Sequence, residues 1–136
     1  MGSLQHTLRF PRRNRLKSPL TIRSVSRDGG RLYGDGFSVH WSPIAYPKSD
    51  RTTTAPRLAF VVSRHSGRAH ERNRIKRRLR EAVRINRAAW PQPPGGLDIV
   101  FRAIGATAAN SAFENLRQDV KRIFAQIGAS KKPQHE

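Results

Sequence analysis

The stretch from Val61 to Ile85 constrains the fold of this chain more than any other segment. Its first residues are apolar, as in a short strand, and Ser66-Gly67 then predicts a turn. A helix is expected from about Gly67 to Ala89, because apolar residues recur at the helical spacing i, i+4, i+7 and i+8: Ile75, Leu79, Ala82 and Val83. One side of this helix can therefore pack against a sheet.

A second stripe of the same helix is strongly basic. At about 100° per residue, it collects side chains that lie away from the apolar stripe: Asn73, Lys76, Arg77, Arg80, Arg84 and Arg87. Arg74 and Arg78 fall elsewhere on the helix, nearer to Glu81. Neighbouring cations repel one another by roughly 0.2–0.5 kcal/mol per pair, and a bound polyanion would offset this repulsion. The alternative is a solvated basic face without a ligand.

The whole chain is basic as well, with 27 Lys and Arg against 9 acidic residues and a net charge of +18 over 136 residues. This length supports one domain with a modest core. The charge imbalance favours nucleic acid as a partner. A membrane surface is the rival, but no stretch approaches about 18 apolar residues, so we expect no membrane partner. The chain has no cysteine, which excludes disulfides and thiolate zinc sites and fits a cytoplasmic location.

Two motifs resemble the signature of the bacterial ribonuclease P protein subunit: V-V-S-x-x-x-G from Val61 to Gly67, and R-N-R-I-K-R-R-L-R-E from Arg72 to Glu81. Weaker resemblance covers residues 13–128. The family's protein is the small subunit of a ribonucleoprotein endoribonuclease that removes 5′ leaders from precursor tRNA. The resemblance implies that the large RNA subunit holds the catalytic magnesium ions. It also implies two partners for a single copy of this chain, the catalytic RNA and precursor tRNA.

The resemblance further implies that the basic helix meets the catalytic RNA. Matched residue by residue, the motif supplies Arg72, Asn73, Arg74, Lys76, Arg77 and Arg80. Arg64 and His65 stand where the family usually has two lysines. The same basic surface is extended by Arg68, Arg84 and Arg87. Phosphate contacts give affinity and position rather than sequence reading, which suits a subunit that acts on many tRNA precursors.

A cleft for the RNA leader is implied between the first helix and the sheet. The family carries aromatic residues on that helix, whereas the matching positions here hold Ile22 and Ser26. On a strand expected over residues 37–42, His40 falls where the family tends to have an aromatic, and the alternation turns it away from the core. His40 is either a ring that stacks on a base or an ordinary exposed histidine. Ile22 either lines the cleft or belongs to the core.

The remaining elements complete an α+β fold. Besides the basic helix, we expect two helices over residues 18–28 and 111–128, and four strands near 31–33 and over 37–42, 57–63 and 97–103. Because residues 57–63 are almost continuously apolar, we place this strand at the centre of the sheet. The resemblance implies a two-layer α/β sandwich with a mostly antiparallel sheet and a left-handed β-α-β crossover, although about 98% of such crossovers are right-handed.

The single domain is expected to span residues 18–128. Residues 1–17 are basic and contain Pro11, so they form either a flexible tail or an arm that becomes ordered on RNA. Residues 129–136 are expected to be disordered.

No catalytic constellation is visible in the sequence. The acidic residues are scattered, Asp98 lies within a strand among core residues, and there is neither a zinc-binding spacing nor a phosphate-binding loop. We therefore interpret the chain as an RNA-binding domain of an enzyme whose catalytic groups lie on RNA. The alternatives are a non-catalytic RNA-binding protein, such as a ribosomal protein or RNA chaperone, and a nuclease that acts alone. The missing carboxylate cluster disfavours the nuclease.

Overall fold

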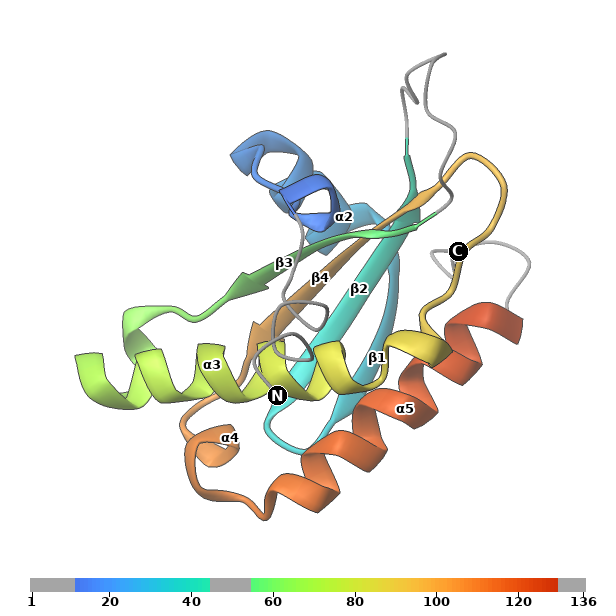
Figure 1. Cartoon of the computed structure of the whole chain (residues 1–136). Coiled ribbons are helices and arrows are strands. Elements are labelled where there is room, and N and C mark those ends of the chain that lie inside the picture. Colours follow the sequence, from blue (N-terminus) through green and yellow to red (C-terminus); the bar gives the residue numbers. More distant parts are fainter. Residues whose placement is uncertain (1–11, 45–54, 130–136) are drawn as a thin grey trace.

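The computed structural model of the protein describes residues 12–44 and 55–129. They form a four-stranded sheet with the order β1-β2-β4-β3 (Figure 1). Its strands are β1 (Gly30–Gly34), β2 (Phe37–Pro43), β3 (Arg57–Val61) and β4 (Leu97–Ala103). The pairs β1–β2 and β2–β4 are antiparallel, and β3–β4 is parallel. The predicted α+β fold with a mostly antiparallel sheet is confirmed.

Helices cover both faces of this sheet. They are α2 (Pro19–Asp28), α3 (Ala69–Ile85), α4 (Thr107–Asn110) and α5 (Phe113–Ala129), with 3-10 turns η1 (Arg12–Asn14), η2 (Arg64–Ser66) and η3 (Arg87–Ala89). α3 and α5 pack on one face, whereas α2 covers part of the other (Figure 1). The sandwich thus has a partial third layer. Ser111 ends α4, which was not predicted, instead of starting the last helix, because its N–H donates to Thr107 O at 3.1 Å.

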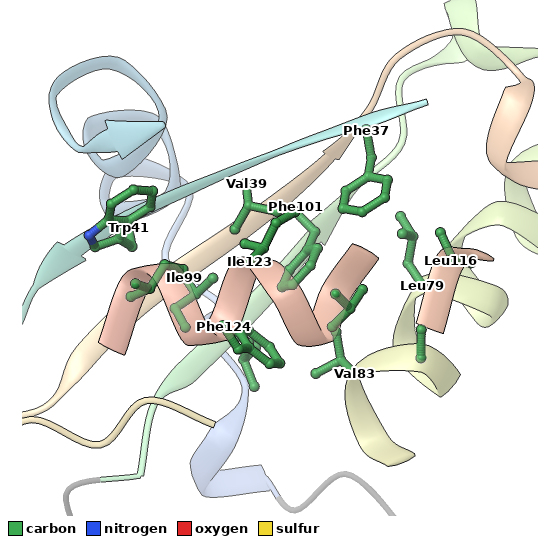
Figure 2. Packing of buried hydrophobic residues seen from close by; sticks show 14 of the residues in the cluster. Phe37, Val39, Trp41, Leu79, Val83, Ile99, Phe101, Leu116, Ile123 and Phe124 are labelled. Atoms are coloured by element: carbon green, nitrogen blue, oxygen red, sulfur yellow. The ribbon is translucent and has the colours of Figure 1, made fainter. Parts of the chain in front are cut away.

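The main core is centred on Phe101 of β4, which is fully buried (Figure 2). Its ring stacks on Phe37 and Phe60 with centroid distances of 6.1 and 5.4 Å. It also meets Phe124 of α5 edge-on at 5.9 Å. Such aromatic pairs contribute roughly 0.5–1.5 kcal/mol beyond the burial of their area. The cluster therefore joins α5 and three strands into one unit on which α3 also packs.

The prediction that residues 57–63 form a central strand is wrong, because β3 lies at the edge of the sheet and β4 in its interior. The preceding chain segment covers the outer edge of β3 instead. Leu16 N donates to Leu58 O at 2.8 Å, and Asn14 Nδ2 donates to Pro56 O at 2.9 Å. Because an uncovered apolar edge invites pairing with other chains, this segment allows β3 to keep the composition of an interior strand.

The same contacts anchor the end of the segment 1–17, which was expected as a flexible or contact arm. Asn14 and Leu16 are only 1% and 6% exposed. For these last residues the prediction of a flexible arm is wrong, since pairing with β3 orders the backbone. Residues 1–11, and residues 130–136 of the expected tail, lie outside the described part of the chain.

The basic helix connects two parallel neighbours, because the chain passes from β3 through α3 into β4. Figure 1 shows α3 in front of the sheet. When both strands are turned to point upward in this view, β4 lies to the left of β3. The crossover is therefore left-handed, as the resemblance implied.

A buried ion pair also joins β3 to β4. Asp98 is 2% exposed and accepts two hydrogen bonds from its register partner Arg57, from Nε at 2.7 Å and from Nη2 at 2.8 Å. This bidentate geometry satisfies a carboxylate that has lost its water. Asp98 therefore supports the sheet.

Replacing Arg57 by Met should lower the free energy of unfolding by about 3–5 kcal/mol, because the Asp98 carboxylate stays buried without its partner. Urea denaturation measures this change. The double variant Arg57→Met/Asp98→Leu should recover most of the loss, since apolar residues can replace a buried pair at little cost. A loss below about 1 kcal/mol for the single variant would instead indicate a pair of the weak surface type.

Candidate nucleic-acid interface

The basic helix α3 follows a tight turn at the position that the sequence predicts. Gly67 has φ of 122°, and a β-carbon there would lie 2.8 Å from Glu71 Oε1, so the turn requires glycine. The Arg68 N–H donates to the same carboxylate at 2.9 Å. An acidic group at a helix N-terminus also interacts favourably with the helix dipole. The helix therefore begins at Ala69, slightly later than expected.

Burial of the apolar stripe sets the rotation of α3 about its axis. The predicted stripe residues are all 0% exposed and belong to the main core: Ile75, Leu79, Ala82 and Val83. Because residues four apart share one side of a helix, the polar side chains fall into three rows. We call them the groove row (Arg72, Lys76, Arg80), the outer row (Asn73, Arg77, Arg84) and the clamp row (Arg74, Arg78). Residues adjacent in sequence thus fall on different rows.

Two residues of the groove row, Lys76 and Arg80, line a pocket of about 240 Å³ at the edge of β3. α3, α2, β3 and the N-terminal segment all line it, with side chains that include Arg15, Lys17, Ile22, Phe60, Lys76 and Arg80. Four of the lining residues are cations and none is acidic. The pocket therefore suits an anionic group such as an RNA phosphate.

Arg80 shows how closely the cations crowd this pocket. Its guanidinium carbon lies 5.8 Å from the centre of the Phe60 ring. Burial, together with the charge of Arg15, lowers the pKa of Arg80 from its usual value. Arginine nevertheless keeps its charge in proteins. Since no ion pair of Lys76 or Arg80 occurs in the described residues, their charge remains available to an external anion.

The outer row begins with two residues that are open to solvent. Asn73 and Arg77 are exposed. Arg84, in contrast, pairs with Glu81 one turn earlier, with its Nε 3.2 Å from the carboxylate. Arg87, which follows the helix, lies over the Trp90 ring at 5.5 Å. Arg84 and Arg87, the last two predicted RNA contacts, are therefore partly buried, and each interacts with another side chain of this protein.

The clamp row turns towards the segment that follows β4. Arg74 Nε donates to Ala109 O at 2.6 Å, and Arg78 Nε donates to Ala108 O at 3.0 Å. These carbonyls belong to the last turn of α4, where positive charge is favourable. Arg78 also lies over the Phe113 ring at 5.7 Å. Arg74, predicted to contact RNA, thus has an intramolecular contact that the motif did not reveal.

Three further predicted residues extend the basic surface past the start of α3. Arg64, His65 and Arg68 are all exposed. Arg64 and His65 belong to the turn η2, which is capped by Ser63, whose Oγ accepts from the His65 N–H at 3.3 Å, whereas Arg68 directly precedes α3. These three side chains lie outside the core, next to the N-terminus of α3.

The three residues predicted to line a leader cleft have different surroundings. Ile22 lines the groove pocket. Ser26 Oγ donates to Ile22 O at 2.8 Å and accepts from Arg102 Nη1 at 3.3 Å. His40 is 5% exposed in a part of the sheet over which α2 packs. The expectation that His40 is an exposed histidine is therefore wrong, whereas its role in a leader cleft stays a prediction.

The surroundings of His40 keep its imidazole neutral. Burial, together with the charges of Arg31 and Arg102, lowers the pKa of His40 to about 4. Its Nε2 lies 3.0 Å from Ser38 Oγ, and its Nδ1 has no hydrogen-bond partner among the described residues. At neutral pH His40 therefore offers no positive charge to RNA.

Stability should fall with acid in the range where His40 titrates. The unfolded chain takes up this proton near pH 6.5, whereas the native chain resists it until about pH 4. The stabilisation by neutral His40 is thus complete above pH 6.5 and is lost as the pH falls towards 4. His40→Gln should flatten the dependence of unfolding free energy on pH in this window. An NMR titration of the wild-type imidazole with a midpoint near 6.5 would contradict the burial.

Two residues at the groove were absent from the predicted interface. Arg15 and Lys17 reach it because the N-terminal segment pairs with β3. Asn14 and Leu16 are buried while Arg15 and Lys17 are exposed, which is the alternation of a strand. This short alternation is the signal from which their position could have been inferred.

Metal binding and membrane insertion find no support in residues 12–44 and 55–129. No group of three or more His, Asp or Glu residues there could hold a metal ion. No helix in the same part of the chain has the length and apolar character needed to cross a membrane. The basic surface around α3 offers guanidinium and ammonium groups to a ligand, and these groups bind phosphate by charge-assisted hydrogen bonds.

Known proteins share this sequence pattern over most of the chain. A family profile described as Ribonuclease P matches residues 10–128. The chain is 38% identical over 115 residues to the ribonuclease P protein component of Symbiobacterium thermophilum, covering 84% of this chain and 90% of that protein. It is 37% identical over 114 residues to the component of Roseiflexus castenholzii, covering 84% and 85%.

Solved structures share the fold. The RNase P protein from Thermotoga maritima superposes with a TM-score of 0.66 at 24% identity, covering 82% of this chain and 96% of that one. The protein from Staphylococcus aureus gives a TM-score of 0.62 at 20% identity, covering 85% and 95%. Given the profile match, the relatives and the basic motif on α3, the chain belongs to the ribonuclease P protein family.

Proposed function

We propose that this component of an endoribonuclease complex binds the catalytic RNA through α3 and the adjoining groove, and assists removal of the 5′ leader from precursor tRNA. The groove row carries this proposal. Lys76 and Arg80 meet Arg15 and Lys17 around one pocket that contains no acidic side chain. Four cations in one place repel each other unless an anion lies between them.

The arrangement of these four cations around the groove fits an RNA backbone. The cations come from α3 and from the segment before α2, so they surround the groove from two sides. Ile22 and Phe60 add apolar surface beside them. Binding of a phosphate here releases counterions from the RNA, and this release makes affinity strongly dependent on salt. A contact of this kind positions an RNA without reading its sequence.

We place the chemistry and its magnesium ions on the RNA subunit, as membership of the family implies. The protein then supplies positive charge close to the RNA and to the precursor. In this arrangement one copy of the chain serves one RNA subunit in the cytoplasm. A ribosomal protein or RNA chaperone would share the basic composition, but the profile match over residues 10–128 favours ribonuclease P.

A pair of lysine substitutions tests the role of the groove. Lys76→Ala should weaken binding to a bacterial ribonuclease P RNA and reduce the slope of log K against log salt by about 0.7–0.9, the value for one phosphate. Lys121→Ala, an exposed lysine of α5, is the matched control and should leave the slope unchanged. Equal salt slopes for both variants and the wild type would mean that Lys76 is exposed to solvent and contacts no phosphate.

Reconstitution tests the function as a whole. At low magnesium concentration, cleavage of precursor tRNA should require both the chain and the RNA subunit, because the protein compensates charge that magnesium otherwise screens. Cleavage is measured with each component alone and with the two together. Activity of the chain alone would support a nuclease that acts by itself. Failure to stimulate the RNA would support an RNA-binding protein of another class.

A further inference from the structure

α3 borders a second pocket, which lies between its outer row and its clamp row and reaches the start of α5. The volume of this pocket is about 350 Å³, and it is lined by Arg77, Arg78, Glu81 and Phe113. We call it the Phe113 pocket, after the first residue of α5. The groove offers four cations and no acid, whereas the surface of the Phe113 pocket is mostly carbon and includes one carboxylate. The two pockets therefore suit different chemical groups.

The size and walls of the Phe113 pocket suit a single flat ring system. Small-molecule pockets span roughly 300–1,000 Å³, so this pocket lies at the small end of that range. The Phe113 ring packs against the main core, and the Arg78 guanidinium carbon lies 5.7 Å from the ring centre. Arg78 is held there, because its Nε donates to Ala108 O at 3.0 Å. Unpaired bases of RNA stack on aromatic rings and on guanidinium planes, so both walls are preformed for a base.

Glu81 decides between a base and a phosphate. Its side chain is 43% exposed and pairs with Arg84, whose Nε lies 3.2 Å from the carboxylate. A carboxylate has about four acceptor positions, so Glu81 can accept further hydrogen bonds. It repels a phosphate, whereas the exocyclic amino group of a base can donate to it. The pocket therefore favours adenine, cytosine or guanine over uracil, which has no amino group.

Arg77 connects the Phe113 pocket to the surface on which α3 is proposed to bind RNA. It is exposed and forms no ion pair within residues 12–44 and 55–129. Since Arg77 also lines the pocket, a phosphate bound to its guanidinium brings the base of a neighbouring nucleotide close to Phe113. An RNA chain on α3 can thus supply both the negative charge for Arg77 and the ring that the pocket fits.

We propose that the Phe113 pocket binds one unpaired, amino-bearing base of the catalytic RNA. Phe113 and Arg78 contact the face of the base, and Glu81 accepts from its amino group. Arg77 binds an adjacent phosphate. This inference rests on the proposed function and adds a base contact to a surface whose other contacts are with phosphate. A base contact can distinguish the RNA subunit from other RNAs, which phosphate contacts do not.

Substitutions of Phe113 test the stacking in the full chain bound to a bacterial ribonuclease P RNA. Phe113→Ala should weaken binding by about 5- to 150-fold, the loss of one stacked base. The slope of log K against log salt should stay unchanged, because no phosphate contact is removed. Phe113→Tyr keeps the ring and should bind like the wild type, whereas Phe113→Leu keeps apolar packing against the core and should still bind weakly. Urea denaturation of each variant identifies any loss of folding.

Glu81→Ala separates a base from a phosphate by the sign of its effect. It makes the protein more positive, so a helix that meets only phosphates should bind RNA more tightly. The Phe113 pocket predicts the opposite, a loss of about 10-fold, because a hydrogen bond to a charged acceptor is removed. Glu114→Ala is the matched control and should not weaken binding. Glu114 also pairs with an arginine three residues later, but it does not line the pocket.

Chemical probing of the RNA identifies the bound base. Dimethyl sulfate modifies unpaired adenine and cytosine, and kethoxal modifies unpaired guanine. One such base should be protected by the wild-type chain and by Glu114→Ala, but not by Phe113→Ala. Tighter binding by Glu81→Ala, wild-type affinity of Phe113→Leu, or protection that Phe113→Ala retains would overturn the assignment of a base to this pocket. Failure of the wild-type chain to bind the RNA subunit would instead contradict the proposed function itself.

Discussion

Burial of one side of α3 determines what the rest of this helix can do. Ile75, Leu79 and Val83 are fully buried against the core around Phe101. Each such side chain contributes roughly 1.5–3 kcal/mol, while each pair of neighbouring cations costs roughly 0.2–0.5 kcal/mol. The apolar contacts outweigh the repulsion, so the helix keeps one rotation and its cations stay where the core places them. A surface of concentrated positive charge can therefore exist without its RNA.

That rotation gives neighbouring arginines different roles. The clamp row satisfies carbonyls at the end of α4, whereas the groove row faces the segment that covers the edge of β3. This segment itself has two roles, because Leu16 pairs with the backbone of β3 while Arg15 adds charge to the groove. On the other face of the sheet, α2 encloses His40 and leaves Tyr33 open. Each face thus combines a covered, apolar part with an exposed, cationic part.

Local patterns predicted the elements well because their causes are local. Ser18 caps α2 directly before Pro19, and the alternation of Phe37, Val39 and Trp41 marks β2. What the sequence could not predict depends on which distant segments meet. The edge position of β3 and the enclosure of His40 by α2 are results of this kind. The hand of the crossover came only from the resemblance, since general physical rules favour the opposite one.

Rotation about the axis of α3, and not arginine content, decides which residues of this helix are available to RNA. The most direct measurement compares Arg77→Ala with Arg78→Ala, two adjacent arginines on different rows. For Arg77→Ala, the salt slope of binding to the ribonuclease P RNA should fall by about 0.7–0.9 with stability unchanged. For Arg78→Ala, the free energy of unfolding should fall by about 1–3 kcal/mol, because buried carbonyls lose their donor, while the slope is retained. Equal losses of slope for the two variants would contradict the account.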